Sequence, residues 1–422
     1  MTHSTRVTLE HLRDLDARLV SVAREVRVLS SLSWPEGTLR RFLISWRQGE
    51  PQLPDVTPTP RDLGDVRREL DAICDAVDPS DPMQVFVART ADSYATAARM
   101  LEAVGTPDMT LCSRLLYGVP DDLMPGSQLS HRRAAELLLE NTENLVAAGV
   151  IPQSERTCPA EEAAVRMRHA FESFFGPDAP TVEIDPELAS KAAAGSRRVR
   201  IRGTTTFSEL DLAQLIEHEG FVHTATALNG RAQPNLACMA LNAPRTTATQ
   251  EGIATLAELT TRAIDIARLR RLALRTVAIH QALEGADYID IFRFFLEEGQ
   301  SEAESARSAM RVFRGGDVRG RVAFTKDVVY LCGLVAVHTF LRKAIAESRP
   351  HLVRRLFAGR LALPDVFLLD GAFARGDVIE PRYVPDWATD LHRLAAYLAF
   401  SAIVNRVDLG TVELEGLLAD GH

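Results

Sequence analysis

Apolar residues recur at three- and four-residue spacings along most of the chain, a pattern typical of helices that bury one face. In the first third, this periodicity predicts helices over residues 9–30, 60–77, 91–104 and 130–148. It returns from residue 208, and there it predicts helices over 208–229, 247–280, 301–315, from 325 through an apolar run, and near 349–359 and 385–405. The chain is therefore expected to be mainly helical.

Residues 151–207 show a different pattern. Segments 182–184 and 198–202 alternate apolar with charged residues, which predicts short strands of one small sheet with an exposed face. On that face, Arg198, Arg200 and Arg202 are expected to lie in water. Alternatively, a strand just before the 208–229 helix could pair with an extended substrate. The predicted fold class is α+β, mainly helical.

Polar residues at three-residue spacing predict where two central helices begin. Ser208 with Asp211 can cap the first helix, and the Asn-Gly pair at 229–230 would end it. Thr247 with Gln250 resembles a capping box for a second, longer helix that runs towards residue 280.

Length and composition indicate an ordinary soluble globular protein. The 422 residues include 48 Lys+Arg and 57 Asp+Glu, giving a net charge of −9, which disfavours a nucleic-acid partner. Length and pattern suggest three regions: an N-terminal helical region (1–150), a central core with the small sheet and the 208–229 helix (151–345), and a C-terminal helical region (346–422).

Cysteine usage and hydropathy suggest where the protein resides. Its five cysteines are far apart and form no CxxC pair, which suits a reducing compartment. The first 19 residues lack the apolar core of a signal peptide, and the longest apolar run, 328–341, is too short to span a bilayer. A cytoplasmic protein without a membrane partner is expected.

The most informative stretch contains an H-E-x-x-x-H pattern, formed by His218, Glu219 and His223. Neutral imidazoles are good ligands for Zn²⁺, and a glutamate between them can act as a base on metal-bound water. In the familiar H-E-x-x-H spacing, two histidines four residues apart share one helix face. Alternatively, both histidines are ordinary helix residues, one buried and hydrogen-bonded, the other exposed.

The spacing of the two histidines makes a structural requirement. Five residues apart, they lie about 140° apart around an ideal α-helix. They can reach one ion only if the helix is locally widened, as in a π-type turn, which is favoured at functional sites. The sequence therefore predicts a bulge between His218 and His223.

A catalytic zinc ion usually has three protein ligands and a water molecule. Glu251 opens the next predicted helix, and the 229–244 loop is long enough to turn that helix start towards the histidines. Glu251 is thus the preferred third ligand. Glu258, two turns further on the same face, is the reserve ligand or a partner of a histidine N–H.

Three segments carry a family resemblance: HEGFVHTATALNG at 218–230, Gln-Pro at 233–234, and a stretch at 247–254 that contains QEGIA. They resemble the QEGLA-motif family of zinc peptidases, whose bacterial members are called flavohemoglobin expression-modulating proteins. Its animal relatives include the microtubule-associated tyrosine carboxypeptidase. The similarity is strongest over residues 195–340, and isoleucine replaces the usual leucine of the motif.

The resemblance implies a zincin-like metallopeptidase fold. It implies zinc bound by His218, His223 and Glu251, with Glu219 as the general base. It also implies a carboxypeptidase, with a preference for Tyr or Phe at the substrate terminus that comes from the animal relative alone.

Downstream residues suit other tasks of such an enzyme. The substrate's terminal carboxylate must be neutralised, and Arg314, Arg321 and Lys326 are candidates at loops or helix starts. Tyr330 is the candidate for stabilising the tetrahedral oxyanion. For each residue alone, helix capping or surface solvation fits the sequence equally well.

The sequence thus favours a zinc-dependent carboxypeptidase acting on a peptide or protein C-terminus, with the oligomeric state left open. One alternative is a non-catalytic metal-binding regulatory protein that retains the peptidase fold. Another is a zinc hydrolase acting on a different carbonyl substrate. The arginines within 268–271 are expected to form a solvated helix face.

Overall fold

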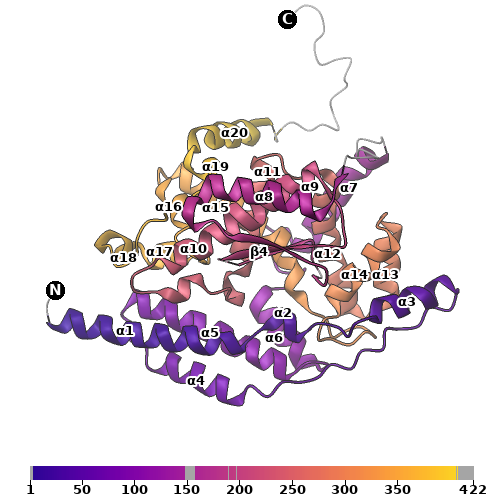
Figure 1. Ribbon diagram of the computed structural model, residues 1–422, viewed down its shortest axis with the longest axis horizontal. Coiled ribbons are helices and arrows are strands. Elements are labelled where there is room, and N and C mark those ends of the chain that lie inside the picture. Colours follow the sequence, from indigo (N-terminus) through magenta and orange to yellow (C-terminus); the bar gives the residue numbers. More distant parts are fainter. Residues whose placement is uncertain (1–2, 148–156, 189, 196, 405, 407–422) are drawn as a thin grey trace, which may run out of the picture.

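Helices connected by short loops make up most of the computed structural model, which describes residues 3–147, 157–188, 190–195, 197–404 and 406 (Figure 1). The predicted class, mainly helical α+β, is confirmed. The first third contains helices α1 (His3–Val22), α2 (Val28–Ser31), α3 (Thr38–Arg47), α4 (Gly64–Asp75), α5 (Pro82–Glu102), α6 (Pro107–Tyr117) and α7 (His131–Ala147).

The site-bearing helices follow. They are α8 (Ala160–Phe175), α9 (Glu209–Leu215), the π-helical segment η3 (Ile216–Thr224), α10 (Ala225–Arg231), α11 (Thr247–Thr260), α12 (Ile266–Glu284), α13 (Tyr288–Glu297), α14 (Glu302–Val312) and α15 (Val329–Ala346). Short 3₁₀ turns are η1 (Ala23–Glu25), η2 (Gly176–Asp178), η4 (Ala237–Ala240), η5 (Pro244–Thr246) and η6 (Thr325–Val328). The C-terminal helices are α16 (His351–Arg355), α17 (Asp365–Leu368), α18 (Asp370–Arg375), α19 (Asp386–Thr389) and α20 (Leu391–Val404).

Two small sheets lie on the same side of the molecule as α8. In the larger, β2 (Thr181–Asp185) runs parallel to β4 (Arg198–Arg202), and β3 (Ala192–Ala194) runs antiparallel to β4 along the edge. The second pairs β1 (Thr157–Cys158) with β5 (Phe207–Ser208). The two predicted strands are confirmed, whereas β3 and the second sheet were not predicted.

Several predicted helix boundaries are wrong for identifiable reasons. The helix expected over 247–280 is two helices, because Asp265 caps the start of α12 by accepting a hydrogen bond from the Arg268 N–H. The Thr247–Gln250 capping box does not form; Thr246 is the N-cap residue of α11, and the Gln250 side chain instead accepts a hydrogen bond from Thr226.

The Asn-Gly pair at 229–230 does not end its helix, which runs to Arg231. The Asn229 amide nitrogen donates to the carbonyl oxygens of Phe357 and Tyr383, so this residue joins distant segments. Helices α3, α6 and α8 were not predicted, and the 9–30 helix is interrupted after Val22. Residue 148 and the predicted boundary between residues 150 and 151 lie outside the described residues.

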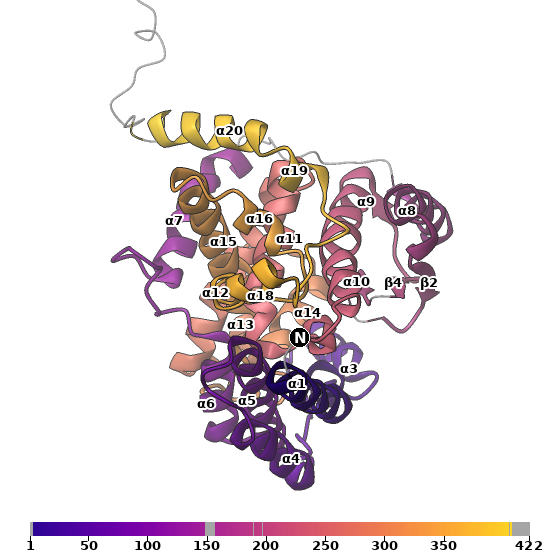
Figure 2. The ribbon, with the colours of Figure 1, turned by 90° about the vertical axis from the view of Figure 1, so that its left-hand side faces the viewer.

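One hydrophobic core runs through the middle of the molecule. It combines buried residues of α1, α4 and α5 with those of α11, α15 and the C-terminal helices. A second core joins α3 to α12, α13 and α14, and a third packs α8 against the sheet, α9 and α10. Figure 2 shows helices α1, α4, α5 and α6 below α11 and α15, with the sheet and α8 to one side. The division into three regions stays a prediction.

The segment Thr325–Ala346 is 22 residues long and apolar enough to cross a membrane, judged only by length and composition. The apolar run over residues 328–341 lies within this longer segment. This helix also serves the core: Val329, Val337 and Leu341 are buried in the cluster that contains Ile253 of α11.

Two glycines allow α11 and α15 to touch through their backbones. A Cβ atom on Gly252 would lie 2.3 Å from the carbonyl oxygen of Gly333, and one on Gly333 would lie 2.1 Å from that of Ala248. The glycine of the QEGIA motif is thus required by packing. It lets α11 lie against α15 while the adjacent Glu251 faces the pocket described below.

Gly252→Ala is expected to destabilise the fold by about 1–3 kcal/mol, because the added methyl group must push two backbones apart. Urea denaturation measures the change. Gly371→Ala is the matched control, since its Cβ would meet only the flexible Nη1 of Arg375 at 3.3 Å. Equal stability of the Gly252→Ala and native proteins would contradict the close packing.

Candidate active site

The helix that carries both histidines is widened where the sequence requires it. Its start is fixed by a capping box, in which the Asp211 N–H donates to Ser208 Oγ at 3.1 Å and the Ser208 N–H donates to Asp211 Oδ2 at 3.0 Å. The chain then enters η3, a π-helical segment that contains His218 and His223. The predicted bulge is confirmed. It brings the centres of the two imidazole rings within 4.7 Å.

Glu251 of α11 meets the two histidines. Its Oε2 atom lies 3.2 Å from Nε2 of His218 and 3.7 Å from Nε2 of His223. One ligand atom from each of the three residues lies within 4.8 Å of the others, so the group could hold a metal ion.

The donor set fits zinc. Tetrahedral N and O ligands about 2.05 Å from Zn²⁺ are about 3.3 Å apart, close to the distances from Glu251 to the two imidazoles. Oε2 of Glu251 is buried and has no hydrogen-bond partner among the described residues. A cation bound by this oxygen and the two imidazoles would satisfy it.

Glu258 lies on the other side of His218. The His218 Nδ1–H donates to Glu258 Oε1 at 2.7 Å, so Nε2 is the nitrogen that faces Glu251. Gln214 and Arg268 also donate to the fully buried Glu258 carboxylate. Of the two roles considered for Glu258, this geometry favours the partner that orients a histidine ligand.

Charges around this cluster shift several pKa values. Burial lowers the pKa of His218, but the nearby carboxylates of Glu251 and Glu258 outweigh it and raise the pKa to about 10. Burial raises the pKa of Glu251, yet Lys326 and the two histidines hold it well below its usual range. Burial likewise opposes the effect of Arg268, which with His218 lowers the pKa of Glu258 to about 2. The two buried carboxylates, Glu251 and Glu258, thus favour a positive charge on His218.

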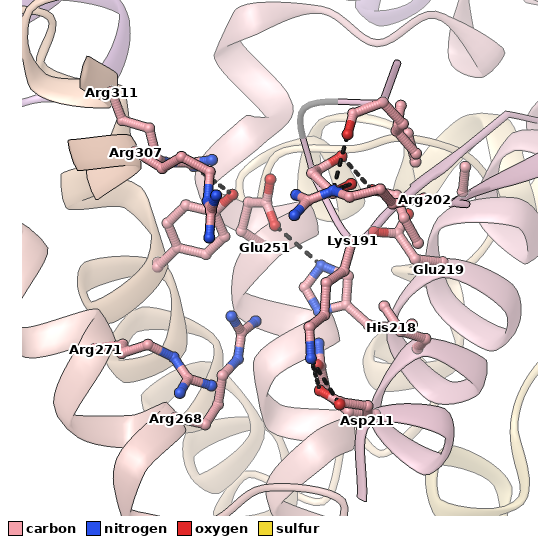
Figure 3. A pocket seen from close by; sticks show the side chains of 18 of the residues that line it. Lys191, Arg202, Asp211, His218, Glu219, Glu251, Arg268, Arg271, Arg307 and Arg311 are labelled. Carbon is pink, nitrogen blue, oxygen red and sulfur yellow. Dashed lines mark hydrogen bonds and ion pairs between the residues drawn. The ribbon is translucent and has the colours of Figure 1, made fainter. Parts of the chain in front are cut away.

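The three residues line a cavity of about 870 Å³, which Glu219 and Tyr330 also line. Figure 3 shows His218, Glu219 and Glu251 in this cavity. Basic side chains dominate its wall. Helix α12 supplies three of them and α14 with the following turn supplies three more: Arg268, Arg271, Arg275, Arg307, Arg311 and Arg314. The arginines at 268 and 271 therefore do not form a solvated face, and that expectation was wrong, because this side of α12 packs over the site.

Some of these cations are neutralised by buried acids. Arg311 donates to both oxygens of Asp327, at 2.5 and 2.8 Å, and Arg275 lies 3.7 Å from the same carboxylate. Burial opposes ionisation of Asp327, but these two arginines hold its pKa well below its usual range. Nη2 of Arg311 also lies 3.5 Å from the Tyr330 hydroxyl.

Arg314 differs from its neighbours. Its Nε is buried without a hydrogen-bond partner, and within the part of the chain that the structure describes no carboxylate lies at ion-pair distance. Burial and the nearby Arg311 lower its pKa to about 10, so Arg314 remains a cation at neutral pH.

The other predicted substrate-binding residues divide into two groups. Lys326 lines the cavity, with Nζ 3.5 Å from Oε1 of Glu251 and 5.2 Å from the centre of the Tyr330 ring. Arg321 is not among the lining residues. It occupies a left-handed turn (φ 69°) beside Gly285, and its backbone N–H donates to the Ala282 carbonyl at 2.7 Å.

The sheet contributes two basic side chains that were expected to lie in water. Arg198 and Arg200 pair with Glu183 and Asp185 across β2 and β4. Arg202 instead donates to the carbonyls of Leu188 and Ser190, and both Arg200 and Arg202 line the cavity.

Sequence reasoning missed most of the basic wall. One signal was available: Arg268, Arg271 and Arg275, and likewise 307, 311 and 314, have spacings that place them on one helix face. Arg360, which also lines the cavity, follows α16 in an irregular segment, and no local pattern marks it.

Comparison with known proteins adds one match. A family model described as "Microtubule-associated tyrosine carboxypeptidase" matches residues 40–406. This span contains all of the basic and metal-ligating residues of the cavity discussed above. No curated protein matches the chain.

Proposed function

Because the chain belongs to the microtubule-associated tyrosine carboxypeptidase family, we propose that it is a zinc-dependent carboxypeptidase with a zincin-like core. The observation that carries this proposal is the meeting of His218, His223 and Glu251 beside Glu219 in one arginine-lined cavity. The proposed substrate is the C-terminus of a peptide or protein, and the proposed location is the cytoplasm.

The chemistry follows from the positions of the side chains. Zinc held by the two histidines and Glu251 would supply a Lewis acid and lower the pKa of water. The Glu219 carboxylate accepts a proton from the attacking water and passes it to the leaving amine, as the C–N bond breaks and a C–O bond forms. Glu258 keeps the ring of His218 in the orientation and tautomer that present Nε2.

The basic wall supports recognition of a carboxylate-rich chain end. Arg314 has a buried guanidinium without an acidic partner among the described residues, so it is proposed to bind the terminal carboxylate. Lys326 lies 3.5 Å from Glu251, and the Tyr330 hydroxyl lies 3.5 Å from Arg311; Tyr330 is proposed to donate to the developing oxyanion. Arg271 and Arg307 further along the cavity favour acidic residues upstream of the cleaved bond.

A peptide digest tests this function. The purified protein is expected to contain zinc and to release one residue from acidic peptides that end in Tyr or Phe, as measured by mass spectrometry. Matched peptides with a C-terminal amide are expected to react about 100-fold more slowly, because a buried charge pair is lost. Chelation should abolish the release, and added zinc should restore it.

Two outcomes separate the alternatives. Bound zinc with no cleavage of any peptide would favour the regulatory protein that keeps the peptidase fold. Cleavage within the chain, or equal rates for the acid and amide peptides, would contradict a carboxypeptidase.

A further inference from the structure

Arg360 is held firmly beside the proposed metal ligands. It is 8% exposed, and its backbone N–H donates to the Met239 carbonyl at 2.7 Å. A Cβ on the preceding Gly359 would lie 2.8 Å from the Met239 Cβ, so this segment lies tightly against η4. The position of the Arg360 side chain is therefore set by the fold rather than by a surface loop.

The Arg360 guanidinium is buried without a matching anion. Its Nη2 donates to the His223 carbonyl at 3.4 Å, which is a long hydrogen bond, and its Nε has no partner in the described ranges. No described carboxylate lies within 4 Å of it, although buried arginines are nearly always paired. The guanidinium remains charged at neutral pH. An anion that forms only during the reaction would give this guanidinium its missing partner.

The contact between Arg360 and the His223 carbonyl indicates where that anion would be, and the charges around Arg360 agree with it. Burial lowers the pKa of Arg360, while Tyr94, Glu219 and Glu251 act in the opposite direction. Arg314, the other arginine of the cavity with a buried unpartnered Nε among the described residues, is affected by Arg311, Asp327 and Tyr330 instead. The two arginines thus serve different parts of one cavity. Arg360 is on the side of His223 and the proposed base.

We propose that Arg360 is a catalytic residue that donates to the scissile carbonyl oxygen as that oxygen becomes negatively charged. The inference rests on the proposed function. When the water oxygen adds to the carbonyl carbon, the C=O π pair moves onto oxygen and Glu219 holds the water's proton. When the C–N bond breaks, the pair returns and the amine receives the proton. Arg360 exchanges no proton, and its fixed charge stabilises the transition state more than the substrate.

Two ligands distinguish this role from substrate binding. A phosphinic peptide mimics the tetrahedral oxyanion, and the truncated product peptide carries only the ground-state contacts. Arg360→Ala is expected to keep its zinc, to lower kcat about 100-fold and to leave KM within about threefold. Its affinity for the phosphinic peptide, measured by calorimetry, is expected to fall about 100-fold, with product affinity nearly unchanged. Arg314→Ala, the matched control, is expected to raise KM and to weaken binding of the phosphinic peptide through lost terminal-carboxylate contacts.

Other results would overturn the inference. Native phosphinic-peptide affinity in Arg360→Ala, or a raised KM with native kcat, would show that Arg360 does not act on the oxyanion. If Arg360→Ala loses zinc, Arg360→Lys decides: it should hold zinc and bind the phosphinic peptide about tenfold more weakly than the native protein, and native affinity would refute the role. A native protein that neither holds zinc nor cleaves peptides would instead refute the proposed function.

Discussion

Glu219→Gln is expected to retain zinc and to lose peptide hydrolysis by about 10³-fold or more. The amide has nearly the same shape as the carboxylate but cannot accept the proton of the attacking water, a step worth up to about 10⁴-fold. Because Glu219 is not one of the three clustered ligand residues, zinc content should stay at the native level. The two measurements are kcat on an acidic peptide and metal content by mass spectrometry.

Glu217→Gln is the matched control in the same π-helical segment. Glu217 is absent from the cavity wall, and burial, with Asp386, raises its pKa to about 7. Substitution by a neutral amide should therefore leave turnover close to the native value. Native turnover in Glu219→Gln would remove Glu219 as the base.

The metal-site geometry could be predicted because it depends on short-range rules. Two histidines five residues apart can face one ion only across a widened turn, and η3 is that turn. Glu251 was predicted because it lies near the start of the next helix, where a loop could return it to the histidines. These inferences needed only helix geometry and ligand chemistry.

Tertiary contacts decided what sequence patterns could not. Gln250 hydrogen-bonds to Thr226 on another helix, so it is unavailable for the predicted cap. Asn229 links α10 to two C-terminal segments and stays helical, although Asn-Gly is a common stop signal. Arg360 reaches the cavity from a segment 137 residues after His223. No local periodicity carries such information, because the position is set by packing against Met239.

For the basic residues, too, local spacing predicts one part of the arrangement and tertiary contacts decide the rest. The spacing of arginines along α12 indicates a common face, but not whether that face meets water or a cavity. Burial of Glu258 and Asp327 decides whether the arginines face water or the interior, since each buried carboxylate requires a cation nearby. Arg268 pairs with Glu258, and Arg311 pairs with Asp327. Each acid lies on a different element from its arginine, so only the folded chain brings the two together.

Glu251→Ala is expected to weaken zinc binding more than Glu258→Gln does. Glu251 presents an unpartnered oxygen to two imidazole nitrogens, whereas Glu258 contacts the opposite nitrogen of one ring. Loss of a residue that only orients a ligand typically costs 10- to 100-fold in metal affinity, so loss of the ligand itself should exceed about 100-fold. Competition with a chromophoric chelator measures both affinities.

His218→Ala provides the reference, because it removes an undisputed member of the cluster, and its zinc affinity should fall as far as that of Glu251→Ala. Folding is checked by denaturation, since Glu251→Ala also leaves Lys326 without its carboxylate at 3.5 Å. If Glu251→Ala binds zinc like the native protein while Glu258→Gln does not, Glu258 is the third ligand. The helix would then have to turn Glu258 away from Arg268, and that rearrangement would separate the basic wall from the metal site it encloses.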